Sequence, residues 1–147
     1  MNSRMRSALL AIWQAPQNIL GLFIAKWNRE YPRRHFQDKT VVFWGNDHAG
    51  MSLGNYIFIP FHSVESINDE SSYSSSYVFR HEFSHTIQSR YLGPLYLFII
   101  GLPSVLWSNV SVLKNMRSTY KISYYDFFVE KWASNLGNRF FAVAHTT

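Results

Sequence analysis

The most informative absence from this 147-residue chain is cysteine, of which it has none. Disulfide scaffolds, cysteine zinc fingers, iron–sulfur sites and thiol nucleophiles are therefore excluded together, and any metal must be held by His, Asp or Glu. Charged residues are also scarce, at 16%, whereas hydrophobic residues reach 47%. This balance excludes disorder and coiled coil as the main state, and the length suits one domain that covers residues 1–147.

The 14 Lys and Arg residues outnumber the 9 Asp and Glu residues, so the formal net charge is +5. The Lys and Arg residues are scattered along the chain and do not alternate with aromatic residues in a nucleic-acid platform, so no nucleic-acid partner is expected. An anionic membrane surface stays compatible with this charge.

Residues 1–28 begin with arginines and continue into an apolar stretch, as a signal peptide does. Polar residues interrupt that stretch at 14–18 and no small-x-small cleavage site follows, so we expect no cleavable leader. Two short helices around Pro16 fit better. The second, Asn18 to Trp27, has a face that suits either core packing or a membrane interface; this face carries Ile19, Leu22, Phe23 and Lys26.

Strand signals are confined to the middle of the chain. Thr40 to Trp44 is β-branched and aromatic, and Leu53 to Phe61 is a second such run that ends near Pro60. The polar runs beside them, Tyr31 to Lys39 and Ser63 to Ser76, are typical of loops. We therefore predict an α+β fold with N-terminal helices, a small antiparallel sheet and then a helical half.

The longest stretch without a charged residue runs from Tyr91 to Leu113. Its length would cross a bilayer, but its Gly and Pro residues would break a single straight helix. Two interpretations stay open here, one in which the stretch enters a membrane and one in which it packs in a soluble core.

The segment YVFRHEFSHTIQSR, residues 77–90, carries the sequence H-E-x-x-H as His81, Glu82 and His85. Residues four apart lie on one face of a helix, so both imidazoles can reach one metal ion, and Glu82 projects toward a water bound to that ion. In a chain of this composition the motif is expected by chance about 0.01 times. It therefore predicts a metal-binding helix.

A catalytic zinc site needs a third protein ligand and an open position. Glu130, in a predicted helix from Ser123 to Leu136 that Gly137 would close, is the preferred third ligand. The alternative is an ordinary surface acid paired with Lys131. Other residues that could complete the site are His62, Asp126 and His145, whereas His35 and His48 are expected in solvent-exposed loops.

Together, HEFSH (81–85) and EKWAS (130–134) resemble the gluzincin-type metallopeptidases, in which a glutamate on a later helix follows H-E-x-x-H. EKWAS is similar to the E-x-x-A-D pattern of CAAX-prenyl and related membrane endopeptidases, with Ser134 where Asp is usual and Asp126 as a substitute partner for a ligand histidine. The region from His81 onward also resembles small uncharacterised bacterial proteins with a metallopeptidase motif.

The resemblance implies a zinc-dependent peptidase with Zn²⁺ on His81, His85 and Glu130, and with Glu82 as the general base toward a peptide or protein substrate. It also implies that the Leu53 to Phe61 strand lies at an edge and pairs with the substrate backbone. The residues weighed as oxyanion donors, none of which the sequence selects, are Arg117, Tyr120, Tyr124 and Tyr125.

Two rival functions stay open. One is a small membrane-associated binding or structural protein with a degenerate or non-catalytic metal site. The other is hydrolysis of a bond other than a peptide bond. Because the chain is short, a partner protein or an oligomer could complete a substrate pocket.

Overall fold

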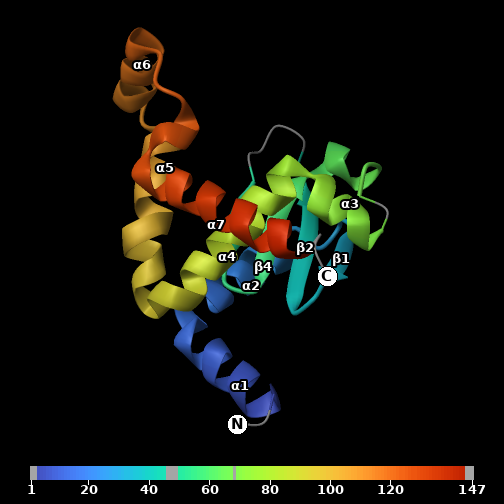
Figure 1. The fold of residues 1–147 in the computed structure, drawn as a ribbon. Coiled ribbons are helices and arrows are strands. Elements are labelled where there is room, and N and C mark those ends of the chain that lie inside the picture. Colours follow the sequence, from blue (N-terminus) through green and yellow to red (C-terminus); the bar gives the residue numbers. More distant parts are fainter. Residues whose placement is uncertain (1–2, 46–49, 68, 145–147) are drawn as a thin grey trace.

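The computed structural model describes residues 3–45, 50–67 and 69–144, and these residues form helices around a four-stranded sheet (Figure 1). His48 and His145 lie outside the described residues. The elements in chain order are α1 (Ser3–Trp13), α2 (Ala15–Trp27), β1 (Arg33–Phe36), β2 (Lys39–Trp44), β3 (Met51–Leu53), β4 (Tyr56–Pro60), η1 (Phe61–Val64), α3 (Glu70–Ser75), α4 (Tyr77–Leu92), η2 (Gly93–Leu95), η3 (Leu97–Gly101), α5 (Leu102–Asn109), α6 (Ser111–Tyr120), η4 (Tyr124–Asp126) and α7 (Phe128–Ala144).

This arrangement confirms the α+β fold, with N-terminal helices, then the sheet, then a helical half. The expected break between two short N-terminal helices is also confirmed. It lies at Gln14, and Pro16 stands in the first turn of α2, where its missing N–H leaves no hydrogen bond unmade.

The sheet is mixed rather than purely antiparallel, which corrects the prediction. Its strand order is β1-β2-β4-β3, and the central strands β2 and β4 run parallel. The segment from Leu53 to Phe61 is not one strand, because the chain turns at Gly54, whose φ of 62° favours glycine. The turn makes a β3–β4 hairpin in which β4 is internal and β3 is the edge.

Three further boundaries differ from the sequence predictions. The expected loop at 31–39 contains β1, which pairs with β2. The expected loop at 63–76 contains the end of η1 and all of α3, which begins because the Asp69 side chain accepts the Ser72 N–H. The last helix starts at Phe128 and continues through Gly137 instead of ending there.

The sheet lies between two helical layers (Figure 1). On one face, α3, α4 and α7 pack over Val41, Phe43 and Ile57. On the other, α2 packs over Val42 and Phe58. The central strands are therefore buried on both faces, which explains why their sequences are continuous apolar runs.

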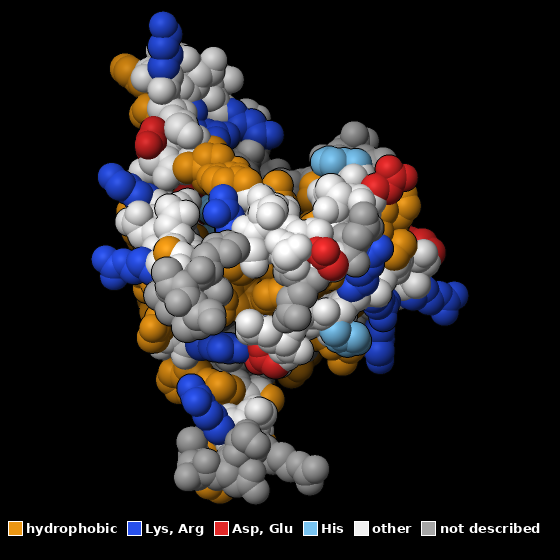
Figure 2. All heavy atoms as spheres, turned by 45° about the vertical axis from the view of Figure 1, so that its right-hand side comes forward, with side chains coloured by type: hydrophobic (Ala, Val, Ile, Leu, Met, Phe, Trp, Pro, Cys, Tyr) orange, Lys and Arg blue, Asp and Glu red, His pale blue; other side chains and the backbone are white. Residues whose placement is uncertain are grey.

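The segment after α4 bends repeatedly instead of forming one straight helix. Helix α4 ends at Gly93, whose φ is 54°, and η2, η3, α5 and α6 follow. Among the described residues no single helix is long and apolar enough to cross a membrane, but two bent pairs have the required length and composition, Met5–Trp13 with Ala15–Trp27 and Tyr77–Leu95 with Leu97–Asn109. On the face drawn in Figure 2, Lys and Arg side chains project at several places, with hydrophobic side chains between them.

Candidate metal centre

Helix α4 presents the H-E-x-x-H residues to α7. Its first turn is capped by Ser76, whose hydroxyl accepts the Phe79 N–H. Phe79 and Phe83 pack into the core, as the sequence predicts for a buried helix behind a site. The two helices approach closely at Gly137, where a Cβ would lie 2.3 Å from the Ser84 Oγ and 3.2 Å from the Arg80 carbonyl oxygen, so a larger residue would displace the Ser84 hydroxyl.

His81, His85 and Glu130 converge at this contact. The His81 Nε2 lies 2.9 Å and the His85 Nε2 3.2 Å from the Glu130 Oε2, and the two Nε2 atoms are 3.3 Å apart. All three residues are buried, and Glu130 is fully so. This trio could hold a metal ion.

The spacing of the three ligand atoms fits a metal ion. Ligands bound at about 2.0 to 2.2 Å in a tetrahedron lie about 3.3 to 3.6 Å from one another. The observed separations of 2.9 to 3.3 Å are close to that range. A tetrahedral ion on this trio would keep its fourth position open to a water molecule or a substrate.

Hydrogen bonds determine which nitrogen of His85 faces the cluster. The Gln88 Nε2 donates to the Val129 carbonyl, at 3.0 Å, which leaves the Gln88 Oε1 as the acceptor for the His85 Nδ1–H, at 2.7 Å. The His85 Nε2 is therefore the nitrogen that faces the cluster, and it would present its lone pair to a bound metal ion. The His81 Nδ1 lies 3.4 Å from the Ser134 Oγ in the same way. Such partners are typical of metal-binding histidines.

The Ser134 contact corrects the expectation for Asp126. The Asp126 carboxylate accepts the backbone N–H of Ser123 at the start of η4, so it serves a cap and not His81. The side chain that lies beside the His81 Nδ1 is the Ser134 hydroxyl.

The second oxygen of Glu130 is held by two hydroxyls. Ser104 of α5 donates to the Oε1 at 2.5 Å, and Tyr124 of η4 donates to it at 3.0 Å. Burial raises the pKa of Glu130, but hydrogen bonds with His81 and His85 outweigh this and hold it well below its usual range. Glu130 is therefore an anion, and its Oε2 is directed to the histidines.

Glu82 is buried against the edge strand β3. Its Oε2 lies 2.9 Å from the Ser52 Oγ, and its carbonyl oxygen lies 2.6 Å from the same hydroxyl. Burial raises the pKa of Glu82, against the opposing charges of His85 and His81. A Cβ at Gly50 would lie 2.3 Å from the Glu82 Oε1, so the missing side chain makes room for this carboxylate.

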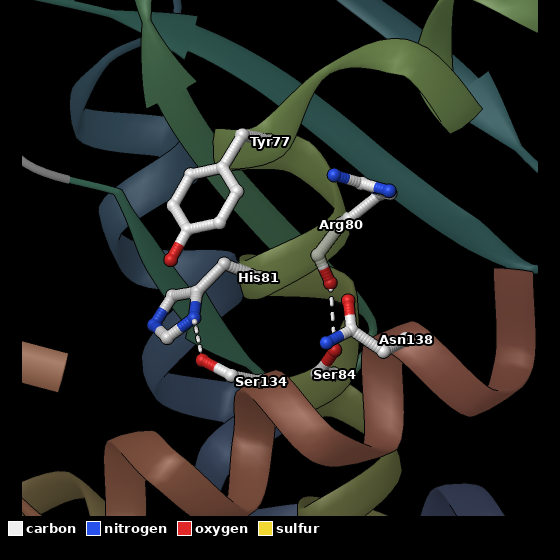
Figure 3. A pocket seen from close by; sticks show the side chains of 7 residues that line it. Tyr77, Arg80, His81, Ser84, Ser134 and Asn138 are labelled. Atoms are coloured by element: carbon white, nitrogen blue, oxygen red, sulfur yellow. Dashed lines mark hydrogen bonds between the residues drawn. The ribbon is translucent and has the colours of Figure 1, made fainter. Parts of the chain in front are cut away.

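A small pocket of about 120 Å³ adjoins His81 on the Ser134 side (Figure 3). Tyr77 lies over the imidazole, with the two rings nearly parallel and their centroids 6.3 Å apart. The remaining lining residues come from α4 and α7 and are Arg80, Ser84, Gly137 and Asn138.

The alternatives weighed from the sequence lie elsewhere. His35 is exposed as predicted, and His62 is exposed in η1 and outside the trio. The surface-acid interpretation of Glu130 is wrong, because its side chain is fully buried.

The four residues considered as oxyanion donors lie in different surroundings. Tyr120 is exposed on α6, Tyr124 is bonded to Glu130, and the ring edge of Tyr125 faces His81 with centroids 5.1 Å apart. Arg117 lies over the rings of Trp107 and Tyr124.

Sequence reasoning missed three residues that hold the site, Ser52, Gln88 and Ser104. Gln88 could have been found, because it lies three residues after His85 and so shares its helix face. Ser52 and Ser104 come from distant segments whose local sequence carries no signal for this role.

Comparisons of the chain with models of known protein families, with curated proteins and with solved structures gave no match.

Proposed function

We propose that this protein is a zinc-dependent hydrolase, and that the bond it cleaves is a peptide bond. The observation that carries the proposal is the convergence of two imidazole nitrogens and one carboxylate oxygen on a single point beside the buried carboxyl group of Glu82. Zinc is favoured because it binds two histidines and one carboxylate with tetrahedral geometry and keeps the fourth position open.

The chemistry assigned to the residues follows from their charges. A bound zinc ion would make water more acidic and polarise a carbonyl group. Glu82 would accept a proton from the attacking water and then pass it to the nitrogen of the leaving amine as the carbon–nitrogen bond breaks. The burial that raises the pKa of Glu82 suits this double role, because it makes the carboxylate a stronger base toward the attacking water.

Strand β3 supports a peptide as the substrate. It pairs with β4 on one side, and no other described strand pairs with it. Its residue Ser52 contacts Glu82, so an extended chain beside β3 would pass the general base. The Ser52 carbonyl oxygen accepts a hydrogen bond from the Tyr96 hydroxyl at 2.9 Å. A substrate peptide would therefore pair with β3 beside this hydroxyl or displace it.

Metal content tests the first half of the proposal. Purified wild-type protein should contain about one zinc ion per chain by elemental analysis, and the His81→Ala/His85→Ala variant none. The matched control is His35→Ala/His62→Ala, which removes two exposed histidines and should leave the zinc content unchanged. No bound metal in the wild type after zinc addition would refute the metal site.

Glu82→Gln tests the second half. This variant keeps the side-chain shape but cannot accept the proton, so hydrolysis of a quenched-fluorescence peptide library should fall by ~10²- to 10⁴-fold while the zinc content stays at the wild-type level. Equal turnover in the variant would refute the role of Glu82. Metal binding without turnover in the wild type would favour a non-catalytic metal-binding protein.

A further inference from the structure

Helix α2 has its polar and small residues inside and its large apolar residues outside. Gln17 is fully buried, and its Nε2 donates to the Ser89 Oγ and the Gly93 carbonyl, both at 2.9 Å. Phe23, in contrast, is 67% exposed. In a soluble protein the apolar stripe of a helix faces the core, so α2 is reversed. The buried positions of this helix are Gln17, Gly21 and Ala25.

The neighbouring segment from η2 to α5 also exposes large apolar side chains, although it buries Tyr96, Ile100 and Trp107 as well. It lies beside α2, because Leu97 and Ile24 pack on the same cluster. Its Phe98 is 70% exposed. We call six of the exposed large side chains of these two segments the apolar surface, and its members are Ile19, Leu22, Phe23, Leu95, Phe98 and Leu102.

The acidic residues are absent from the parts of the chain that carry the apolar surface. Residues 1–29 and 91–125, which include α2 and α5, contain seven Lys and Arg residues and no Asp or Glu. All the acidic residues lie between 30 and 82 or at 126 and 130. Lys26 and Arg29 are exposed at the end of α2, close in the chain to the apolar surface. The partner of this side of the protein is therefore apolar where it meets the apolar surface and anionic around it.

We propose that the apolar surface inserts into a lipid bilayer with anionic headgroups. Exposed apolar area on this scale is rare in a soluble monomer. Buried glutamines that bond within the protein, together with small residues where helices meet, suit a protein whose outer surface faces lipid.

The positions of two other features agree with a bilayer. Trp27, at the end of α2, is 87% exposed, and tryptophan favours the boundary between headgroups and acyl chains. The helices α1 and α2 together have the length and composition of a membrane segment but bend by 83°. A bent pair of this kind can enter a bilayer and return to the same side. This proposal does not depend on the metal chemistry.

Vesicle flotation tests the proposal. Detergent-purified protein is mixed with vesicles of phosphatidylcholine, with or without phosphatidylserine, the detergent is removed, and the mixture is centrifuged in a density gradient. The wild type should float with the vesicles, and more completely with phosphatidylserine. Phe23→Glu/Phe98→Glu should lower the floating fraction by about tenfold. Phe23→Ser/Phe98→Ser, which adds no charge, should lower it as well.

The matched control is Ser71→Glu/Ser75→Glu on α3, which adds the same two charges at exposed positions on the other face of the sheet. It should float like the wild type. The proposal is overturned if the wild type stays at the bottom of the gradient with both vesicle types, or if the Phe23/Phe98 variants float like the control. If the wild type does not float but forms a dimer in analytical ultracentrifugation, and if Phe23→Glu/Phe98→Glu dissociates that dimer, the apolar surface binds a second copy of the chain instead.

Discussion

Replacing Gln88 with Leu tests whether the hydrogen bonds behind the histidines prepare the metal site. Gln88 is fully buried, accepts the His85 Nδ1–H at 2.7 Å and donates to the Val129 carbonyl at 3.0 Å. Leucine has a similar volume but makes neither bond, so a buried donor and a buried acceptor lose their partners. Each unpaired group costs about 1 to 3 kcal/mol, so we expect the free energy of unfolding of the metal-free protein to fall by ~2 to 6 kcal/mol.

The same substitution should weaken metal binding by about 10- to 100-fold, because the imidazole of His85 loses the group that orients it. Urea unfolding in the presence of a chelator measures the stability, and competition with a chromophoric chelator measures the zinc affinity. Gln88→Glu separates the two effects. A carboxylate still accepts the His85 Nδ1–H but cannot donate to the Val129 carbonyl, so stability should fall while zinc affinity is retained.

Thr86→Val is the control for destabilisation of α4 as such. Thr86 is fully buried on the same helix, and its hydroxyl donates to the Phe83 carbonyl and to no residue of the metal site. Its loss should leave zinc affinity unchanged. The argument for orientation by Gln88 fails if Gln88→Leu binds zinc as tightly as Thr86→Val does.

Three further predictions use other contacts. Gly50→Ala should lower turnover at least ~10-fold without loss of zinc, because the new Cβ would displace the Glu82 carboxylate. The control is Gly101→Ala, whose Cβ meets nothing closer than 3.7 Å and which should keep the wild-type turnover. The prediction is contradicted if Gly50→Ala binds less zinc than the wild type or turns over substrate at the wild-type rate. Ser134→Asp should tighten zinc binding about tenfold in chelator competition, since a carboxylate accepts an imidazole N–H more strongly than a hydroxyl does; weaker binding would count against that contact. Burial lowers the pKa of Lys39 from 10.5 to about 8, so the unfolded chain binds its proton more tightly and the free energy of unfolding should rise by ~2 kcal/mol between pH 8 and 10 in urea titrations. Lys39→Met should lack this rise. If the free energy of unfolding rises with pH equally in Lys39→Met and in the wild type, the assignment of the rise to Lys39 is refuted.

Part of the fold could be read from local patterns. The strand at 40–44 was predicted from its β-branched and aromatic residues, and the helix from Tyr77 from the spacing of its histidines in a stretch without Gly or Pro, all of which are local properties. Strand β1, RRHF, was missed because its exposed polar side chains look like a loop, and it is a strand only through pairing with β2. The parallel pairing of β2 and β4 was missed because the turn at Gly54 sends β4 into the centre of the sheet.

The sequence alone determined that His81 and His85 share one helix face, because they are four residues apart, and it favoured Glu130 over the other candidate third ligands. Only the tertiary structure decided how those residues are held. Gln88 and Ser134 lie behind the imidazoles, and Ser104 and Tyr124 hold the second oxygen of Glu130.

The tertiary structure also decided that the apolar face of α2 points outward. The sequence left core packing and a membrane interface open for this face, whereas the face that the structure buries carries Gln17, Gly21 and Ala25. Gly21 explains this choice, since a Cβ there would lie 2.7 Å from the Tyr56 ring. The side of α2 that carries Gly21 is therefore the side that can approach the sheet. Periodicity shows which residues share a face, but the shape of the opposing surface decides which face is buried.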